Sequence, residues 1–421
     1  MNDFAGKKLL VLAGASVHCK VVEAAKELGV YTIVTDYLES SPAKEIADEK
    51  WMLNITDVDA IVERCKAEGV DGVLNVCIDP GQRPYQAICE KLGLPCFGTA
   101  EQFHILTDKK AFKEFCVKNK VDIIPTYTVE DIENGTAEYP LLIKPVDSRG
   151  SRGITVCEDA EEALRGIENA SKESTNGQVV IEKYMAGKQD FSMTYLVVDG
   201  VPNLTRIGDR YLGKVEDGLN KQCVFSMSPS RFSELYIKNV HPNVVNFIKN
   251  LGIKNGPVFM QGFVDGDTVR FYDPGLRFPG TDYEKLFFKA TGINLMKMLV
   301  EYALNGEITD KFGNPHNGYK LCGMTCVQMF VSAKTGKITT YNGIADILAN
   351  ENVIVADQRY VVGETVPPSG DVKQRVAEIV ILTKEKEKVK ELVEWVYDTL
   401  DVRDENDEDM IVSKVDTNIL F

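Results

Sequence analysis

Long apolar runs are missing from this sequence. None reaches the ~20 residues that a helix needs to cross a membrane, and the first residues carry no targeting pattern. A basic charge excess is missing too, since 63 acidic residues against 48 basic ones give a formal net charge of -15. That charge disfavours binding to nucleic acid and to anionic membranes. We therefore expect a soluble cytoplasmic protein with neither kind of partner.

Patterns typical of metal sites and disulfides are also missing. The four histidines are dispersed, without metal-ligand spacing. The ten cysteines are scattered, and the closest pair, Cys322 and Cys326, has no second pair that could complete a zinc site. Because disulfides are rare in reducing compartments, we expect free thiols.

The first hundred residues alternate strands and helices. Apolar strands are expected near residues 8–12, 31–36 and 72–76, with helices at 21–29 and 58–68 between them. This order predicts a parallel sheet of the Rossmann-like α/β type. The first turn, at Gly14, does not match G-x-G-x-x-G, so we expect its own nucleotide site to be unused. The strand ends can still line a cleft shared with the next domain.

The rest of the 421 residues exceeds what one further core usually organises, so about three modules are expected. A helix near 107–119, a strand at 141–145, a helix at 159–171 and a strand at 178–182 indicate a small α+β lobe. Two hairpins turned near 199–202 and 265–267, and a closing helix at 386–400, follow it. The predicted domains are residues 1–104, 105–185 and 186–421.

Lys144 lies at the end of the apolar strand 141–145. A buried lysine needs an anion, which either a bound phosphate or a structural salt bridge would supply. The segment after it, residues 147–153, reads Asp-Ser-Arg-Gly-Ser-Arg-Gly. Glycines that allow close backbone approach, hydroxyls and arginines on one loop suit the charge of a triphosphate. The segment is not a Walker A motif.

The lysine-proline strand followed by a glycine-rich loop resembles the ATP-grasp superfamily of the carboxylate-amine ligase type. That superfamily includes biotin carboxylase, carbamoyl-phosphate synthetase, D-alanine ligase and L-amino acid ligases. The resemblance spans nearly the whole chain and implies a Rossmann-like domain followed by a two-lobed α+β fold that holds ATP between its lobes. The ATP-binding residues that it implies are Lys109, with Lys110 as competitor, Lys144, Ser148, Gly150, Ser151 and Gly153 in the lid loop, Glu182, Lys183 and Met185 at the hinge, and Asp190, with Gln189 as competitor.

The metal end departs from the family pattern, which pairs one acid on a hairpin with an E-x-N-x-R segment and coordinates two Mg²⁺ ions. Gln261 stands at the first place, and Asp273, Gly275 and Arg277 fall in the second. Because Gln261 and Asp273 are equally distant from Asp267 at the turn, we expect their side chains on one face. Magnesium prefers carboxylate oxygens, so Asp273 is the main candidate ligand, and Gln261 offers a carbonyl. The number of metal ions stays open.

Arg277 and Arg210 are the candidate catalytic residues, with Arg206 as a weaker candidate. A guanidinium suits a phosphate or a substrate carboxylate. The resemblance implies an ATP-dependent ligase that joins a carboxylate to an amine through an acyl phosphate and releases ADP and phosphate. The expected partners are small-molecule carboxylate and amine substrates, and the N-terminal domain and last helix are candidate contact surfaces for a homodimer.

Two other functions stay open. An ATP-binding regulatory or scaffold protein with a degenerate metal site would explain Gln261 and Gly275. A carboxylase on the same scaffold is the other alternative, although the sequence contains no biotin-domain-like lysine motif and no glutaminase segment.

Overall fold

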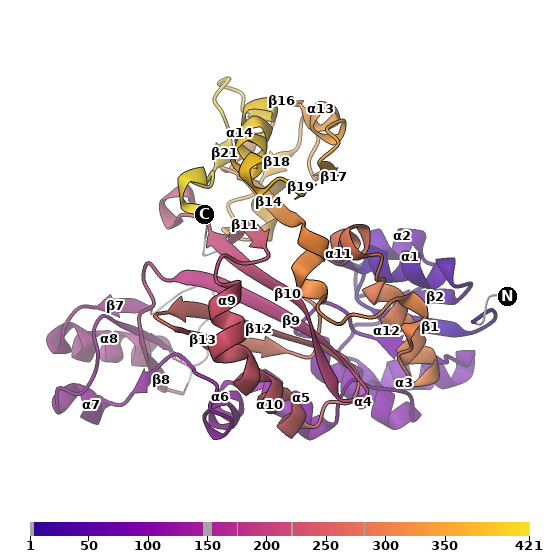
Figure 1. Ribbon diagram of the computed structural model, residues 1–421, viewed down its shortest axis with the longest axis horizontal. Helices are drawn as coiled ribbons and strands as arrows, with labels where there is room; N and C mark the ends of the chain where they lie inside the picture. The colour runs from indigo at the N-terminus through magenta and orange to yellow at the C-terminus, as the bar shows by residue number, and fades with distance from the viewer. Residues whose placement is uncertain (1–3, 146–153, 175, 220–221, 282) are drawn as a thin grey trace.

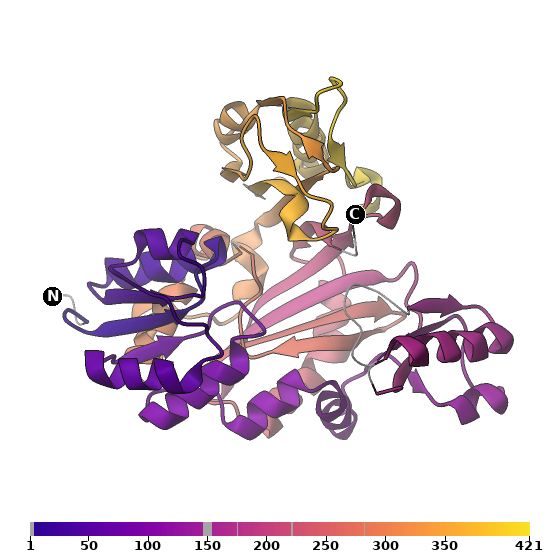
Figure 2. The same cartoon turned by 180° about the vertical axis from the view of Figure 1, so that it is seen from behind.

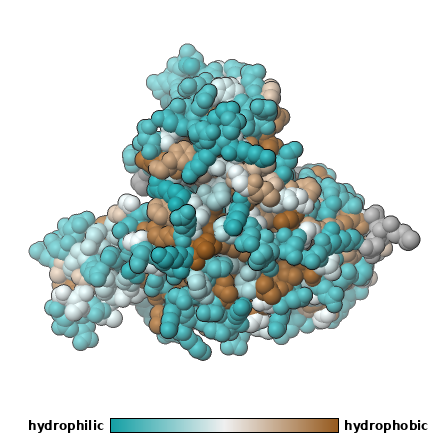
Figure 3. All heavy atoms as spheres, viewed as in Figure 1, coloured by the Kyte–Doolittle hydropathy of each residue, from teal (hydrophilic) through white to brown (hydrophobic). Residues whose placement is uncertain are grey.

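The computed structural model describes residues 4–145, 154–174, 176–219, 222–281 and 283–421. A long sheet lies in the middle, with the N-terminal domain at one end, a small lobe at the other and the C-terminal part above it (Figures 1 and 2). On the face shown in Figure 3, the small lobe and the C-terminal part are mostly hydrophilic, and apolar side chains gather over the central body. Among the helices of the described residues, none is long and apolar enough to cross a membrane.

The N-terminal domain contains the predicted parallel sheet, in the order β3-β2-β1-β4. Its strands are β1 (Lys8–Leu12), β2 (Tyr31–Thr35), β3 (Glu49–Trp51) and β4 (Gly72–Leu74). Its helices are α1 (Cys19–Glu27), α2 (Pro42–Ile46), α3 (Val58–Glu68) and α4 (Gln82–Leu92). The central strands are buried because helices cover a parallel sheet.

The first turn of this domain is filled by its own side chains. The Asp36 carboxylate accepts hydrogen bonds from the backbone N–H groups of Gly14 (2.9 Å) and Leu38 (2.8 Å). The Ser41 hydroxyl occupies the space where a Cβ at Gly14 would lie. A phosphate could reach this turn only by displacing Asp36. That the turn binds no nucleotide stays a prediction.

The small lobe is an antiparallel sheet in the order β5-β8-β6-β7, with its own hydrophobic cluster. Its elements are β5 (Thr126–Tyr127), α7 (Val129–Glu133), β6 (Leu141–Pro145), β7 (Thr155–Cys157), α8 (Ala160–Glu173) and β8 (Val179–Lys183). Helices α5 (Ala100–Thr107) and α6 (Lys109–Lys118) precede it. Asp108 separates them because its side chain caps α6 by accepting from the Ala111 N–H.

The central sheet contains nine strands in the described part of the chain, in the order β13-β12-β9-β10-β11-β14-β19-β17, with β21 paired to β14. The predicted hairpins are present in it. Their strands are β9 (Gln189–Val198), β10 (Val201–Leu212), β12 (Gly256–Asp265) and β13 (Thr268–Gly275). The other strands are β11 (Cys223–Ser228), β14 (Thr325–Ala333), β17 (Val353–Gln358), β19 (Arg375–Thr383) and β21 (Ile411–Val412).

Two helices, α11 (Tyr283–Thr291) and α12 (Leu295–Asn305), join the central sheet to the N-terminal domain, and the two share one hydrophobic cluster. Helices α9 (Ser233–Leu235) and α10 (His241–Leu251) follow β11. Helix α12 packs against α1 and β4, and a buried ion pair between Lys20 and Glu284 joins α1 to α11. The domain boundaries at residues 104 and 185 stay a prediction.

The C-terminal part has a separate cluster between the far strands of the central sheet and the closing helix, which matches the predicted one. Its remaining elements are β15 (Gly336–Lys337), β16 (Thr340–Asn342), α13 (Ile344–Leu348), β18 (Thr365–Val366), α14 (Val389–Thr399) and β20 (Asp401–Arg403).

Candidate nucleotide and substrate site

One face of the central sheet gathers the polar residues of the metal end. Gln261 on β12 pairs with Asp273 on β13, and on its other side with Ser192 on β9. Directly paired residues point to the same face of a sheet. The expectation that Gln261 and Asp273 share a face is confirmed.

A β-bulge in β10 turns Arg206 to this same face. Leu204 pairs with Tyr195, but the next pair is Arg206 with Thr194, so Thr205 is the extra residue. A one-residue insertion reverses which side chains face which side of the sheet. Arg206 therefore lies on the face that carries Arg210 and Ser192, whose pairing residues on β9 and β10 follow in the same register.

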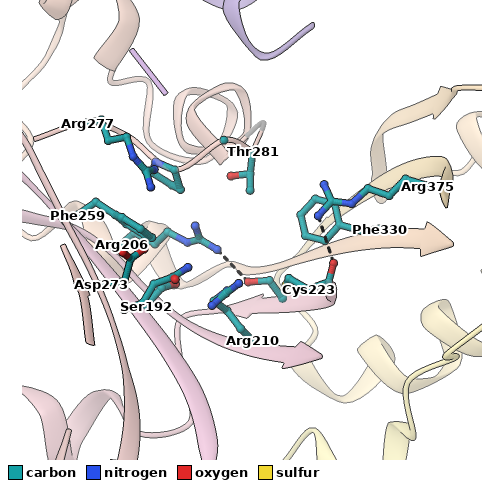
Figure 4. Close-up of a pocket in the computed structure, with 14 residues that line it drawn as sticks. Ser192, Arg206, Arg210, Cys223, Phe259, Asp273, Arg277, Thr281, Phe330 and Arg375 are labelled. Carbon is teal, nitrogen blue, oxygen red and sulfur yellow. Dashed lines mark hydrogen bonds between the residues drawn. The ribbon is translucent and has the colours of Figure 1, made fainter. Parts of the chain in front are cut away.

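A cavity of about 170 Å³ opens above these residues (Figure 4). Four arginines line it, from β10, from β19 and from the segment after β13, and Asp273 is the only carboxylate among its described lining residues. The arginines are Arg206, Arg210, Arg277 and Arg375. Such a lining attracts anions, since the positive groups outnumber the negative one.

Arg277 is held by the N-terminal domain. Its Nε and Nη2 donate to the two carboxylate oxygens of Asp79, at 2.5 and 2.9 Å, in the bidentate geometry that guanidinium groups favour. Gln82 accepts from the Leu276 N–H at 2.8 Å, and the Phe278 N–H donates to the Val76 carbonyl. The loop after β4 thus positions Arg277, which lines the cavity. That the strand ends of this domain line a shared cleft stays a prediction.

Asp273 is half-buried and has neither a hydrogen bond nor an ion pair with any residue that the structure describes. Burial, and then the nearby Asp79 charge, raise the pKa of this carboxyl group, although Arg277, Lys109 and Arg210 oppose the shift. A carboxylate left without a partner in a half-buried place is costly and suits a cation. The donor set fits one magnesium ion at Asp273, with the Gln261 carbonyl beside it.

Gly275 stands where the family carries asparagine, and the structure gives a reason for the change. A Cβ at this position would lie 3.2 Å from Cγ of Arg277 and 3.3 Å from Oε1 of Gln82. That space is already used by the two side chains that connect this segment to the N-terminal domain. No cluster of three or more metal-binding side chains was found among the described residues.

Arg210 is paired with Asp190, its neighbour on β9. The Arg210 Nη1 lies 2.9 Å from Oδ2 of Asp190, and the Tyr272 hydroxyl lies 3.4 Å from the same carboxylate. Burial lowers and Asp190 raises the pKa of Arg210, and the net shift is upward, so the guanidinium stays charged. Gln189, the competitor of Asp190, is itself engaged because its amide donates to the Arg210 carbonyl at 2.6 Å.

Lys144 and Glu182 form an ion pair in the small lobe. The Lys144 Nζ lies 2.6 Å from one carboxylate oxygen of Glu182, and the Lys113 Nζ lies 2.6 Å from the other. Burial favours the protonated acid, but the two lysines hold the pKa of Glu182 below its ordinary value. The structural salt bridge left open by the sequence is therefore present. The phosphate contact of Lys144 stays a prediction.

Sequence reasoning missed Lys113. It lies one helical turn after Lys109 on α6, and this spacing places both lysines on one face of the helix. Of the two earlier candidates, Lys109 acts electrostatically on Asp273, whereas Lys110 approaches Glu114 at 4.0 Å. The choice of Lys109 over Lys110 as the phosphate contact stays a prediction.

The hinge between the lobes leaves a backbone donor available. The Lys183 N–H donates to the Pro125 carbonyl, and its side chain pairs with Glu138 at 2.6 Å. The Met185 N–H has no partner among the described residues, although Met185 is buried. A backbone N–H without a partner among the described residues can donate to an acceptor on a ligand, such as a nitrogen of an adenine ring. The predicted loop residues Ser148, Gly150, Ser151 and Gly153 lie outside the described residues.

Residues 108–273 match the family model described as "Carbamoyl-phosphate synthase L chain, ATP binding domain". Among curated proteins, the small subunit of 2-oxoglutarate carboxylase from Hydrogenobacter thermophilus is 28% identical over 48% of this chain and 48% of its own length. Formate-dependent phosphoribosylglycinamide formyltransferase from Prochlorococcus marinus is 22% identical over 84% of this chain and 88% of its own length. The chain spans about half the length of the first of these relatives.

Solved structures share the whole architecture. Phosphoribosylglycinamide synthetase from Anaerococcus prevotii has a TM-score of 0.78 at 18% identity, covering 95% of this chain and 100% of its own. L-amino acid ligase from Bacillus licheniformis has a TM-score of 0.75 at 18% identity, covering 96% and 100%. Residues 108–273 are therefore similar in sequence to the ATP-binding domain of the carbamoyl-phosphate synthase L chain. The chain as a whole has the fold of these solved structures.

Proposed function

We propose that this protein is an ATP-dependent ligase that joins a small carboxylate to an amine. The observation that carries the proposal is that one cavity is lined both by the Asp273 carboxylate, which has no partner among the described residues, and by the Arg277 guanidinium, which Asp79 holds in place. Most residues that line this cavity lie within residues 108–273, the segment that matches the ATP-binding domain model.

In the proposed reaction, an oxygen of the substrate carboxylate attacks the γ-phosphorus of ATP, and the bond to ADP breaks. The amine nitrogen then attacks the carbon of the acyl phosphate, phosphate leaves, and the amine loses a proton to phosphate or water. Such chemistry depends mainly on positioning and on neutralising charge. Arg277 would hold the carboxylate or the transferred phosphoryl group, with Arg210 beside it.

The proposed nucleotide contacts follow from the groups that remain available. The Met185 N–H and the hinge at Glu182 and Lys183 would receive the adenine, and Asp190 the ribose. Lys109 and Lys144 would neutralise the phosphates, with Ser148, Gly150, Ser151 and Gly153 covering them. A magnesium ion at Asp273 and Gln261 would supply further positive charge to the phosphates when bound.

We also propose that the protein acts in the cytoplasm on small molecules. All ten cysteines are free, which fits a reducing compartment. A homodimer is the proposed assembly. The mass measured by light scattering tests it, since a value near 46.8 kDa would mean a monomer.

The test is ADP release by the full chain with ATP, Mg²⁺ and a panel of carboxylates and amines. The proposal expects release that needs a carboxylate and an amine together. Release with bicarbonate and no amine would favour a carboxylase. ATP binding without ADP release across the panel would favour an ATP-binding regulatory protein. Gln261 and Gly275, which depart from the family pattern at the metal end, are the reason for considering that alternative.

A further inference from the structure

Two of the four arginines in the cavity lack a carboxylate partner among the described residues. Arg277 is paired with Asp79 and Arg210 with Asp190. Arg206 and Arg375 form no ion pair with any described residue, and the Nε of each is buried without a hydrogen bond. Burying a cation costs free energy unless an anion is paired with it. Two guanidinium groups in one cavity, without an ion pair in the described part of the chain, therefore indicate that the cavity binds an anion.

Arg206 is almost completely buried, with 2% of its surface exposed. Its Nη2 donates to the Ser226 hydroxyl at 2.9 Å, and its guanidinium stacks over the Tyr283 ring, 4.8 Å from the centroid. These contacts fix its orientation, and Glu284, the carboxylate that acts on its charge, is already paired with Lys20. Its direction results from the bulge at Thr205, which turns it away from the apolar core.

Arg375 reaches the same cavity from β19, on the side of the C-terminal part (Figure 4). Its guanidinium stacks over the Phe330 ring, 4.3 Å from the centroid, and its Nη2 approaches the Cys223 carbonyl at 3.4 Å. Both unpaired arginines therefore contact β11, one at Ser226 and the other at Cys223. Glu378 acts on the charge of Arg375 but is already paired with Arg359, so neither arginine has a carboxylate of its own among the described residues.

The ATP phosphates are not expected at this place. The nucleotide residues lie on the small lobe, the hinge and the β13 side of the sheet, whereas Arg206 and Arg375 lie beyond β9, on β10 and β19. In the proposed reaction the carboxylate approaches Asp273 and Arg277, which line the same cavity as Arg206 and Arg375. A cavity of about 170 Å³ is small enough for one molecule to contact both pairs of residues.

We infer that the carboxylate substrate carries a second anionic group, a carboxylate or a phosphate monoester, which Arg206 and Arg375 bind. This inference rests on the proposed function, because that function identifies Asp273 and Arg277 as the residues beside which the first carboxylate reacts. Guanidinium groups bind both kinds of anion through paired N–H donors. Ser226, Ser192 and Thr281 add hydroxyl groups to the cavity lining.

The experiment uses matched pairs of substrates that differ only in the second charge. With hydroxylamine as the common nucleophile, ADP release is compared for glutamate against glutamine, succinate against butyrate, and O-phosphoserine against serine. The doubly charged member is expected to have a kcat/KM at least 10-fold higher in one or more pairs. The pair that responds distinguishes a second carboxylate from a phosphate. Equal kcat/KM within every pair would overturn the inference and leave the ligase function standing.

Arg206→Met and Arg375→Met test the assignment to these residues. Each is expected to raise KM for the preferred substrate by roughly 10- to 100-fold, as the loss of a charged hydrogen bond does, with a small change in kcat. Arg206→Lys, which keeps the charge, should recover part of the affinity. Arg403→Met, on an exposed arginine paired with Asp401, is the control. An unchanged KM in both methionine variants would refute the assignment.

Calorimetric binding of the same pairs to the full chain needs no turnover. If no acid supports ADP release, the proposed ligase function fails. The binding measurement still tests whether Arg206 and Arg375 bind a second anionic group. Tighter binding of the doubly charged member, weakened in Arg206→Met or Arg375→Met, would support the anion site. Equal binding within each pair, or no binding of any acid, would overturn it. Thermal unfolding confirms that each variant is folded.

Discussion

Replacing Lys144 with methionine separates its structural role from its proposed role in binding ATP. The Glu182 side chain is 10% exposed and contacts both Lys144 and Lys113 at 2.6 Å, so the variant leaves Glu182 with one partner. Breaking a buried ion pair outright costs ~3–5 kcal/mol. Because Lys144 is 24% exposed and Lys113 remains, we expect a loss of about 1–2 kcal/mol in the free energy of unfolding.

The loss in free energy of ATP binding should be larger than the loss in free energy of unfolding. Losing one charged hydrogen bond to phosphate costs about 1.5–3 kcal/mol, which is roughly 10- to 150-fold in Kd. Lys113→Met is a matched control, since it removes an equal contact to Glu182 from a side chain of similar exposure, 21%. We expect a similar loss of stability in this control but less than about a 3-fold change in Kd.

Calorimetric titration with a non-hydrolysable ATP analogue gives the two Kd values, and denaturant unfolding gives the two stabilities. Equal weakening of nucleotide binding in both variants would refute the reasoning, because it would mean that the orientation of Glu182 and not a phosphate contact of Lys144 controls affinity. An unchanged Kd in Lys144→Met would remove Lys144 from the nucleotide site altogether.

Three further predictions concern the metal end. Asp273→Asn should lower kcat at least about 100-fold, as the loss of a charge-stabilising group does. It should also stabilise the nucleotide-free protein, because it removes a carboxylate that has no partner among the described residues. Normal Mg²⁺ dependence of the variant would place the metal elsewhere. Because burial and Asp79 raise the pKa of Asp273, Mg²⁺ affinity should fall as the pH is lowered through that raised pKa. Asp79→Asn should move this fall in affinity to lower pH. Mg²⁺ titrations at several pH values that show no such move would contradict the electrostatic coupling between Asp79 and Asp273. Gly275→Asn should lower the free energy of unfolding by about 1–3 kcal/mol, because the new side chain would crowd Arg277 and Gln82. A variant that is as stable as the original protein and more active would show that this space is not restricted.

Local patterns in the sequence predicted the main elements of the fold. The helix at 58–68 and the two hairpins depend on periodicity and turn residues within one segment, and the structure contains them. The shared face of Gln261 and Asp273 was predictable for the same reason, since both lie on one hairpin. The families and structures that match the chain agree with the resemblance read from the strand of Lys144.

Contacts between segments that lie far apart in the chain could not be predicted from the sequence alone. The pairing of Asp79 with Arg277 joins two domains, and no pattern along the chain relates these positions. The bulge that turns Arg206 into the cavity is an irregularity of register, which alternation alone does not reveal. Arg375 was also missed, because it starts a late strand that reaches the site only through the strand order of the central sheet.

The most direct measurement of the proposed chemistry is trapping of the acyl phosphate with hydroxylamine. The full chain is incubated with ATP, Mg²⁺, a carboxylate that supports ADP release, and hydroxylamine, and the hydroxamate of that carboxylate is quantified beside ADP. The account predicts equal amounts of hydroxamate and ADP, and neither product from Arg277→Met. ADP release without any hydroxamate would contradict an acyl phosphate, and ATP binding without ADP release would contradict the ligase itself.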